Sequence, residues 1–295
     1  MIDQNHSKKP VVVRLAGGLG NQMFQYAAGL ALATRLGAQL HIDTREYESY
    51  TLHDFGLLQW NISATVAPPY ILSQCSTLRI RLGNKIPLLL GRWLFFKEPS
   101  LAFDPAWLEL RDGKWLLGYF QSEAYFMTVR AKLLKEFTLR DPLGERARKY
   151  LEAIQRCVAV AVHVRRGDYI SNSATLRIHG VCSPQYYQRA ILSIQNRVKL
   201  ARFFVFSNDP MWAKANIDWP EATVFVETED GRAAVDMALM AACQHHIVAN
   251  SSYSWWGAWL SQADQGIKIA PKPWFDDSRY KEQTLVPTQW ERIQK

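Results

Sequence analysis

The sequence predicts an α/β protein with two Rossmann-like halves that face a cleft. Apolar runs of strand length alternate with helical stretches through the C-terminal half, a pattern typical of parallel βαβ units. One run, CVAVAVHV at 157–164, is apolar at nearly every position, as expected of a strand buried on both faces of a parallel sheet. A separate strand, glycine turn and helix open the chain, so we expect an N-terminal half at 1–150 and a C-terminal half at 151–295.

The composition indicates a folded chain whose positive net charge favours binding to an anionic partner. Of the 295 residues, 48% are hydrophobic and 12% aromatic, which is enough to fill two cores and argues against a disordered chain. The formal net charge of +8 suits nucleotides, anionic membrane surfaces or nucleic acids. Nucleic acid is the weakest of the three, because the chain has no zinc-finger or RNP-type motif and no long basic run.

The sequence also favours a cytoplasmic protein. Its first residues, MIDQNHSKKP, are polar, and no apolar run approaches the ~18 residues of a transmembrane helix. Four cysteines lack the CxxC spacing of zinc sites, which favours a reducing compartment: Cys75, Cys157, Cys182 and Cys243. The basic and aromatic segment 79–96 is either a buried element with a basic flank or a contact with the membrane surface.

In chain order, the first element is a β-branched strand at Val11–Leu15, followed by a glycine turn. The turn contains Gly17, Gly18 and Gly20. Asn21 is the expected N-cap of a helix that runs to about Leu36. The arrangement is similar to a dinucleotide-binding fingerprint, but Met23 stands where the third glycine belongs and no GK[ST] follows. The turn either presents backbone N–H groups to a ligand or serves packing alone.

The remaining elements alternate between strand and helix. The N-terminal half continues with a strand at 38–43, a strand at the start of 114–126 and a helix from 121–122 to 134. A helix at 142–156 is expected at the limit between the two halves. The C-terminal half is expected to contain helices at 183–199, 231–243 and 253–262 and one that begins at Pro210, with strands at 158–164, 201–207, 223–227, 245–250 and 267–270. Parallel strands bring their carboxyl ends to one edge, where α/β proteins bind ligands.

The strand at 158–164 ends in a cluster of ionisable side chains. His163, Arg165, Arg166 and Asp168 lie in HVRRGDY at the expected ligand-binding edge. Arginine forks bind phosphate oxygens in pairs, so we interpret this loop as an anion grip for a diphosphate. The alternative is a buried Arg–Asp pair that only stabilises the loop.

Other polar groups follow neighbouring strands. Ser207 and Asn208 lie in SNDP, and Ser251 and Ser252 lie in NSSYSWW at the start of a helix, where free N–H groups attract anions. Taken alone, these serines are better interpreted as helix N-caps. Asp236 interrupts an apolar helix and is either a solvated position or a partner for a base or ribose.

Together these groups suit a nucleoside diphosphate that leaves during a transfer reaction. No DxD, HExxH or His/Cys cluster offers a metal site, so cationic side chains would have to neutralise the departing diphosphate. A sugar nucleotide has such a leaving group, which favours glycosyl transfer over hydride transfer. The tryptophans at 255–256 are expected in the core rather than under a sugar ring.

Five motifs, taken in order, resemble those of glycosyltransferase family 11, in particular its bacterial α-1,2-fucosyltransferases. They are GGLGNQMFQYAAG, GYFQSE, HVRRGDY, FSND and DMALMAACQHHIVANSSYSWWGAWL, and they extend from Gly17 to Leu260. The resemblance implies a GT-B-like fold and an inverting, metal-independent transfer of L-fucose from GDP-β-L-fucose to the 2-hydroxyl of a terminal β-galactoside. It also implies a role in O-antigen or surface glycan synthesis, on a soluble acceptor or on a lipid-linked acceptor at the inner membrane surface.

The resemblance further implies roles for single residues. Arg165 would hold the β-phosphate and stabilise the leaving group, with Arg166 in support. His163 would approach the guanine, and Asp236 would contact guanine or ribose. One serine of the pair 251–252 would bind phosphate. Asn21 would be an active-site asparagine, and the same loops add Gly18, Gly20, Ser207, Asn208, Ser251 and Ser252 as candidate donor-binding residues.

The general base stays open at this point. Asp168 is the nearest carboxylate but could instead orient the two arginines, and related fucosyltransferases differ on whether a protein base is needed. A fucosyltransferase of another linkage, such as α-1,6, would share the arginine motif. The rivals from other classes are a nicotinamide-dependent oxidoreductase and a non-catalytic carbohydrate-binding protein.

Overall fold

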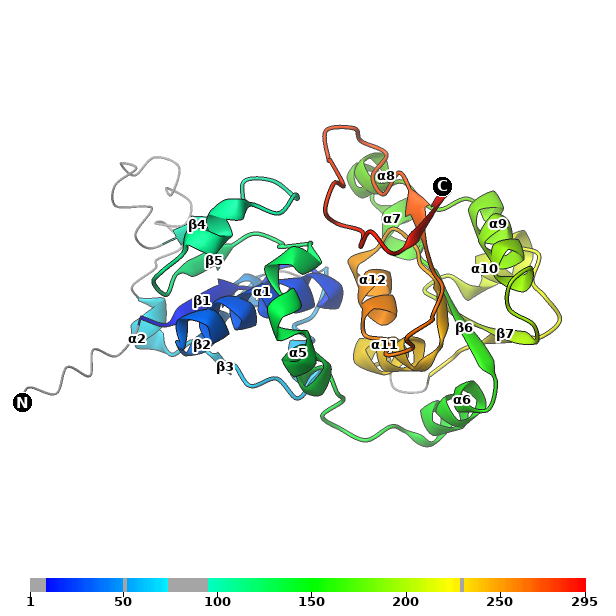
Figure 1. Ribbon diagram of the computed structural model, residues 1–295, viewed down its shortest axis with the longest axis horizontal. Coiled ribbons are helices and arrows are strands. Elements are labelled where there is room, and N and C mark those ends of the chain that lie inside the picture. The colour runs from blue at the N-terminus through cyan, green and yellow to red at the C-terminus, as the bar shows by residue number, and fades with distance from the viewer. Residues whose placement is uncertain (1–8, 50–51, 74–94, 229–230) are drawn as a thin grey trace, which may run out of the picture. The chain divides into compact units, whose positions relative to one another are not determined.

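The computed structural model describes residues 9–49, 52–73, 95–228 and 231–295 (Figure 1). The chain divides into two compact units, Met1–Phe137 and Thr138–Lys295. The division falls ahead of the expected limit at residue 150, because α6 (Glu145–Gln155) packs against α11 (Ala233–Ala242) and β6 (Val158–Val164) of the second unit. Most of segment 79–96 lies outside the described residues, and so does Cys75.

The N-terminal unit is built on a parallel sheet of five strands in the order β3-β2-β1-β5-β4. The strands are β1 (Val11–Arg14), β2 (Leu40–Asp43), β3 (Thr65–Val66), β4 (Phe95–Lys97) and β5 (Trp115–Leu117). The first βαβ unit is confirmed, since α1 (Leu19–Leu36) connects β1 to β2 and ends at Gly37, whose φ of 60° favours glycine.

Two local predictions in this unit are wrong. Helix α1 begins at Leu19 with Gly18 as its N-cap, so Asn21 lies inside the first turn instead of capping it. The single helix expected at 121–134 is divided into short turns and a helix, because the backbone leaves helical geometry at Phe126, where φ is −139°. Its pieces are η4 (Glu123–Tyr125), η5 (Met127–Val129) and α5 (Arg130–Glu136). The other short elements are η1 (Arg45–Glu48), η2 (Leu57–Gln59), α2 (Pro69–Leu72) and η3 (Pro105–Glu109).

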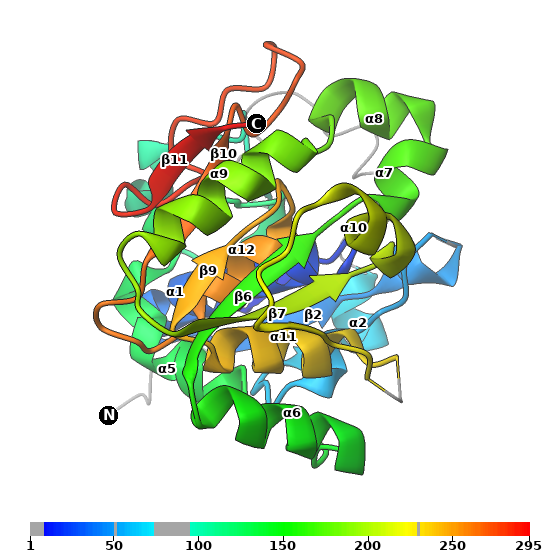
Figure 2. The same cartoon turned by 90° about the vertical axis from the view of Figure 1, so that its right-hand side faces the viewer.

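The C-terminal unit has a six-stranded parallel sheet in the order β8-β7-β6-β9-β10-β11 (Figure 2). Counted along the chain, this is the 3-2-1-4-5-6 order of doubly wound dinucleotide-binding sheets. Besides β6, the strands are β7 (Ala201–Ser207), β8 (Thr223–Phe225), β9 (His245–Ile247), β10 (Lys268–Lys272) and β11 (Glu291–Gln294). The sequence did not predict β11.

Helices cover both faces of this sheet. Figure 1 shows α9 (Pro184–Gln195) and α10 (Pro210–Asn216) on one face, with α11 and α12 (Ser252–Trp259) on the other. Two further helices, α7 (Gly167–Ser171) and α8 (Ser173–His179), follow β6 and were not predicted.

The core of the C-terminal unit explains its regular pattern in the sequence. Strands β6 and β7 are buried at most positions, and α9 contributes one apolar face made of Tyr186, Tyr187, Ala190, Ile191 and Ile194. Trp255 and Trp256 are both fully buried, which confirms the prediction that they belong to the core.

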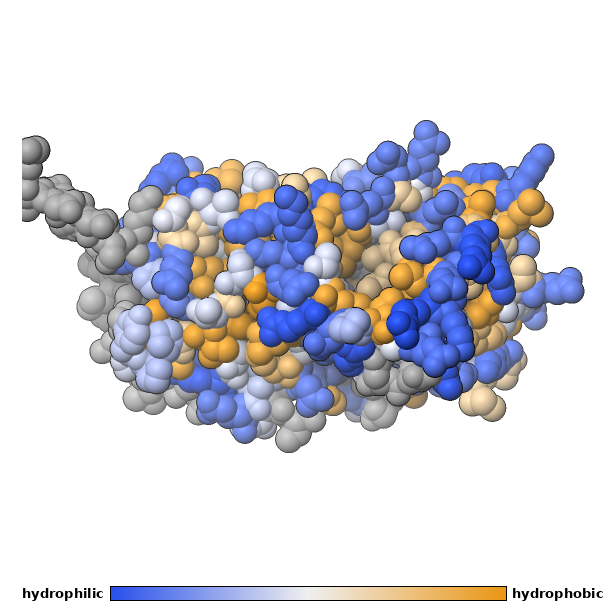
Figure 3. Space-filling model, turned by 90° about the horizontal axis from the view of Figure 1, so that it is seen from below, coloured by the Kyte–Doolittle hydropathy of each residue, from blue (hydrophilic) through white to orange (hydrophobic). Residues whose placement is uncertain are grey.

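The surface of each unit mixes hydrophilic and hydrophobic residues on the face seen in Figure 3. Among the helices of the described residues, none combines the length and the apolar composition needed to cross a bilayer.

Candidate active site

The order of the strands in the C-terminal sheet reverses between β6 and β9, and we call this position the switch point of the sheet. The strands that follow β6 in the chain extend the sheet on one side, and β9, β10 and β11 extend it on the other. The connections that follow the carboxyl ends of β6 and β9 separate and leave room for a ligand. Open α/β sheets generally bind ligands at this position. The loop that contains Arg165 and Arg166, called the arginine loop below, leaves β6 at this position. Asn250, Ser251 and Ser252 follow β9.

The two arginines of the loop lie against aromatic rings. The guanidinium carbon of Arg165 is 5.6 Å from the ring centroid of Tyr169. Arg166 lies closer to its ring, with its guanidinium carbon 3.6 Å from the centroid of Trp212, and its Nε is 3.6 Å from the Asp209 carboxylate. Contact with an aromatic face fixes the plane of a guanidinium group and therefore the direction of its N–H donors.

Asn208 anchors the start of the arginine loop. Its Oδ1 accepts a hydrogen bond of 3.0 Å from the backbone N–H of Arg166. Its side chain also lies so near Gly167 that a Cβ there would be 2.2 Å from Asn208 Nδ2. Ser207 has a local role as well, because its Oγ accepts from the N–H of Asp209 at 2.9 Å. Both residues therefore have a structural role, Asn208 in the arginine loop and Ser207 in the loop that follows β7.

His163, Tyr253 and Asp236 form a second group beside the loop. The rings of His163 and Tyr253 lie 5.4 Å apart. His163 is 5% exposed, and burial together with the nearby Arg165 lowers its pKa to about 3, so the imidazole is neutral. Within the described residues its Nδ1 has no hydrogen-bond partner.

Tyr253 connects this group to α11. Its hydroxyl donates to the carbonyl of Ala233 at 2.5 Å, at the start of α11. Burial and the Asp236 carboxylate raise the pKa of Tyr253, and Arg165 opposes that shift, so both charges act on this phenol. Asp236 itself is half-buried and accepts from Thr228 Oγ1 at 2.8 Å. The structure therefore brings His163, Arg165 and Asp236 around one tyrosine that sequence reasoning missed.

The serines lie at the start of α12, as predicted. Ser251 is the N-cap residue and is 5% exposed, and among the described residues its side chain makes no capping hydrogen bond. Ser252 is the first residue of the helix. The interpretation of Ser251 as a side-chain cap is therefore wrong, and the backbone N–H groups of this turn lie at the switch point. The side chain of Asp168 lies outside the described part of the structure.

The N-terminal sheet has its own switch point, between β1 and β5, and its glycine turn lies there. Gln22 is fully buried and holds the turn through its amide. Its Nε2 donates to the carbonyls of Gly17 at 3.0 Å and Asp54 at 2.9 Å. Its Oε1 accepts from the N–H groups of Gly56 at 3.0 Å and Leu57 at 3.1 Å.

Two more amide side chains bridge this switch point. Gln25 accepts from the N–H of Ala16 at 2.9 Å and donates to the carbonyl of Gly118 at 3.1 Å. The predicted site residue Asn21 accepts from Gln121 Nε2 at 2.8 Å. The motifs that contain Asn21 and Gln121 are therefore in direct contact at the carboxyl ends of their strands.

The predicted glycines have backbone roles in this loop. Gly18 is the N-cap of α1, and Gly20 is a buried residue of its first turn. Gly17 has a φ of +76°, and a Cβ at that position would lie 2.7 Å from Asn21 Nδ2. The turn is therefore tight because Asn21 packs directly onto it.

Glu98 supports the opposite side of the same switch point. Its carboxylate accepts from the N–H of Tyr119 at 2.7 Å and from that of Phe120 at 3.0 Å. Phe120 has a φ of +55°, an unusual conformation for a bulky residue, and it is fully buried. Burial raises the pKa of Glu98, and the two N–H groups oppose that shift. An isolated glutamate after a short strand gives no signal in the sequence.

No group of three or more His, Cys, Asp or Glu side chains in the described residues is arranged to hold a metal ion.

Comparison with known proteins identifies the family. The sequence profile of Glycosyl transferase family 11 matches residues 107–294. An alpha-1,2-colitosyltransferase of Escherichia coli is 38% identical over 97% of this chain and 99% of its own length. The O-antigen biosynthesis glycosyltransferase WbnK of Escherichia coli is 32% identical over 88% of this chain and 93% of its own length.

More distant matches agree. Galactoside alpha-(1,2)-fucosyltransferase 2 of Pongo pygmaeus is 28% identical over 85% of this chain and 69% of its own length. A solved mutant of Arabidopsis thaliana FUT1 in complex with GDP has a TM-score of 0.51 at 14% identity, over 91% of this chain and 71% of that chain. This likeness confirms the GT-B-like fold with two Rossmann-like halves. The profile and the two bacterial relatives establish that the chain is a glycosyltransferase that belongs to glycosyltransferase family 11.

Proposed function

We propose that this glycosyltransferase moves L-fucose from GDP-β-L-fucose to the 2-hydroxyl of a terminal β-galactoside, with inversion at the anomeric carbon. The observation that carries the proposal is the position of the arginine loop and the start of α12 on the two strands that flank the switch point. Two guanidinium groups and a helix N-terminus suit a diphosphate. The α-1,2 linkage in the names of the relatives supports the choice of the 2-hydroxyl.

In this proposal the C-terminal unit binds the nucleotide. Arg165 holds the β-phosphate, Arg166 keeps the loop in place from its position on Trp212, and the N–H groups at Ser251 and Ser252 bind phosphate oxygens. The neutral His163 and the carboxylate of Asp236 face guanine and ribose. Gly18, Gly20 and Asn21 stay proposed site residues of the N-terminal unit.

The reaction is a single displacement. The acceptor oxygen attacks the anomeric carbon as the bond to the β-phosphate oxygen breaks, and GDP leaves with the electron pair. Arg165 stabilises the charge that grows on the leaving diphosphate, and its cation takes the place that a divalent metal has in other glycosyltransferases. The acceptor proton goes to a base, for which Asp168 is the candidate, or to solvent.

A second donor is favoured by one specific observation, the 38% identity to an alpha-1,2-colitosyltransferase over nearly the whole of both chains. Colitose is the sugar that results when L-fucose loses its 3-hydroxyl, so both GDP-sugars present the same diphosphate and the same ring configuration. A site that hydrogen-bonds the 3-hydroxyl would reject the deoxy sugar strongly, whereas a site that only excludes it would favour colitose. Competition between GDP-fucose and GDP-colitose separates the two.

The acceptor is proposed to be a galactose-terminated glycan of an O-antigen or another surface polysaccharide, in line with the name of the relative WbnK. A lipid-linked glycan would bring the enzyme to the inner membrane surface. A soluble galactoside such as lactose or N-acetyllactosamine serves as the test acceptor.

The test measures GDP release from GDP-fucose with and without these acceptors, in EDTA. Acceptor-stimulated release that survives EDTA is the expected result, and linkage analysis of the product should give the α-1,2 isomer rather than α-1,6. If calorimetry detects no binding of GDP, the proposed donor site is wrong. Tight GDP binding without turnover would support the proposed nucleotide and show that lactose and N-acetyllactosamine are not acceptors.

A further inference from the structure

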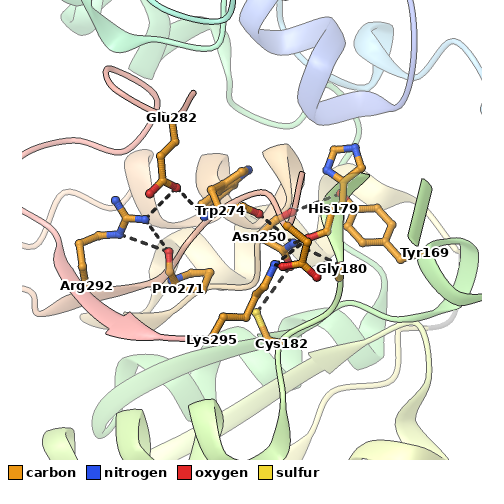
Figure 4. Close-up of polar contacts among 11 residues, drawn as sticks. Tyr169, His179, Gly180, Cys182, Asn250, Pro271, Trp274, Glu282, Arg292 and Lys295 are labelled. Carbon is orange, nitrogen blue, oxygen red and sulfur yellow. Dashed lines mark hydrogen bonds and ion pairs between the residues drawn. The ribbon is translucent and has the colours of Figure 1, made fainter. Parts of the chain in front are cut away.

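The end of α8 is held by two side chains that bind one carbonyl oxygen. Asn250 Nδ2 and Lys295 Nζ each donate a hydrogen bond of 2.7 Å to the carbonyl of His179 (Figure 4). One donor follows β9 and the other follows β11, so two distant segments meet at the connection between the arginine loop and α9. Helix α8 ends at His179, where its carbonyl would otherwise lack a helical partner.

Asn250 is fully buried and joins three loops. Besides His179, its Nδ2 donates to the carbonyl of Trp274 at 3.1 Å, in the loop after β10. Its own backbone carbonyl accepts from the hydroxyl of Tyr169 at 3.2 Å. The residue therefore links the loops that follow β6, β9 and β10.

Lys295 is an unusually buried cation, with 6% of its side chain exposed. An ion pair of 2.6 Å to Asp276 and the hydrogen bond to the His179 carbonyl offset the cost of removing this charge from water. Its backbone N–H donates to Lys272 at 2.9 Å, which holds it beside β10. Gly180 packs against the same aspartate, since a Cβ there would lie 1.8 Å from Asp276 Oδ2.

Tyr169 extends this network to the arginine loop. Its ring lies 5.0 Å from the ring of His179 and 5.6 Å from the guanidinium carbon of Arg165. Its hydroxyl is held by Asn250. A continuous set of contacts therefore runs from Lys295, through the end of α8 and Tyr169, to the guanidinium group of Arg165.

We propose that Asn250 and Lys295 are positioning residues that clamp the end of α8 and thereby hold Tyr169 under Arg165 in the orientation that binds the donor diphosphate. The clamp acts on the shape of segment 167–180 and makes no contact with the substrate. The effect on donor binding rests on the proposed function, whereas the effect on the segment does not.

Lys295→Met tests the clamp, because it removes the ammonium group and keeps the aliphatic stem and the backbone bond to β10. We expect faster amide hydrogen exchange in peptides that cover 167–180. We also expect the KM for GDP-fucose to rise about five- to tenfold, as for the loss of one charged hydrogen bond. The KM for the acceptor at saturating donor should change less than twofold.

Two further variants make the result specific. Lys295→Arg retains a cation that can donate to the His179 carbonyl oxygen and to the Asp276 carboxylate. Its KM for GDP-fucose should therefore lie close to that of the wild type. Lys214→Met removes a lysine of the same unit that is paired with Glu227 at 3.5 Å on the exposed surface, and it should leave both exchange and KM unchanged.

Unchanged exchange in 167–180 in Lys295→Met would overturn the clamp. Faster exchange with an unchanged donor KM would overturn its role in donor binding. If the wild-type enzyme itself does not bind GDP, the proposed donor is wrong, and the exchange measurement still decides whether the clamp exists.

Discussion

The glycine turn of the N-terminal unit and the arginine loop of the C-terminal unit occupy equivalent positions in their sheets. Neutral amide side chains hold the first, whereas cationic side chains dominate the second. Each follows the first strand of its unit, and each lies at the switch point of its sheet. The glycine turn is held by neutral amides that are buried and hydrogen-bonded within the chain, above all Gln22 and Gln25. The arginine loop instead presents two cations that lie on aromatic rings.

The glycine turn serves mainly to keep its shape, and the arginine loop serves to present charge. A buried amide contributes to stability only while its hydrogen bonds are all made, so the glycine turn is rigid and its tolerance of change is small. A guanidinium on an aromatic face keeps its charge and its plane, so the arginine loop retains groups that suit an anionic ligand. Variants of the first loop should therefore lose stability, and variants of the second should lose turnover.

The largest effect is expected for Arg165→Ala. The variant should lose about a thousandfold or more in kcat, since in the proposed mechanism it removes the main charge that stabilises the leaving diphosphate. The GDP-release assay measures this loss, and the melting temperature should stay close to that of the wild type. Arg202→Ala removes an exposed arginine of the same unit and is the matched control, with turnover unchanged. Normal turnover in Arg165→Ala would refute the site assignment.

Gln22→Leu should produce the opposite result. The leucine fills the space but leaves four backbone groups without their hydrogen bonds, one in the glycine turn and three in residues 54–57. The free energy of unfolding should therefore fall by about 3 kcal/mol. Urea denaturation measures the loss, and GDP binding by calorimetry should be unchanged if the nucleotide contacts only the C-terminal unit. Gln39→Leu alters an exposed glutamine of the same unit and should cost little. A variant that kept its stability and lost GDP affinity would reverse the comparison.

The sequence predicted most of the fold because buried parallel strands are apolar at nearly every position. Strands β6 and β7 have this pattern, and the alternation with α9 and α11 follows from it. The short edge strand β11 has the sequence ERIQ and no buried residue, so it carries no hydrophobic signal. The order of the strands depends on contacts between distant segments, which periodicity does not encode.

The candidate site was predictable where a motif placed charged groups after a strand, as at Arg165 and Arg166. It was not predictable where a residue acts through its neighbours. Tyr253 lies two residues before the core tryptophans and has the same appearance in the sequence, although in the structure the charges of Asp236 and Arg165 both act on its phenol. Asn21 was expected to cap a helix, and its side chain instead contacts Gln121, which lies 100 residues away.

Glu98→Gln should destabilise the loop that lies opposite the glycine turn in the N-terminal unit. An amide can present only one acceptor oxygen, so its NH2 group would face a backbone N–H of the loop that contains Phe120. Because Phe120 is held at positive φ by these bonds, we expect a stability loss of about 2 kcal/mol, smaller than that of Gln22→Leu. Urea denaturation checks it, with the exposed Glu109→Gln as control. An unchanged midpoint would mean that aromatic packing alone maintains the Phe120 conformation.

The pH dependence of stability concerns His163 and separates the charge of the arginine loop from its histidine. Burial lowers the pKa of His163 from 6.5 to about 3, so the unfolded chain binds a proton below pH 6.5 that the folded chain rejects. This histidine should therefore reduce the free energy of unfolding by about 1.4 kcal/mol for each pH unit below 6.5, an effect absent above pH 7. His163→Phe should flatten the pH dependence by that amount, measured by urea denaturation between pH 7 and pH 5 against the wild type.

The same shift predicts how ligand binding responds to acid. Since His163 stays neutral through this range, the affinity for GDP should gain nothing from imidazole protonation, and the positive charge of the loop comes from its arginines alone. Calorimetric titration of GDP at pH 7 and pH 5.5 checks this, with each value compared between wild type and His163→Phe. Affinity that increased toward pH 5.5 in the wild type, and not in the variant, would mean that a protonated His163 binds phosphate. The loop would then depend on a titratable cation as well as on its permanent ones.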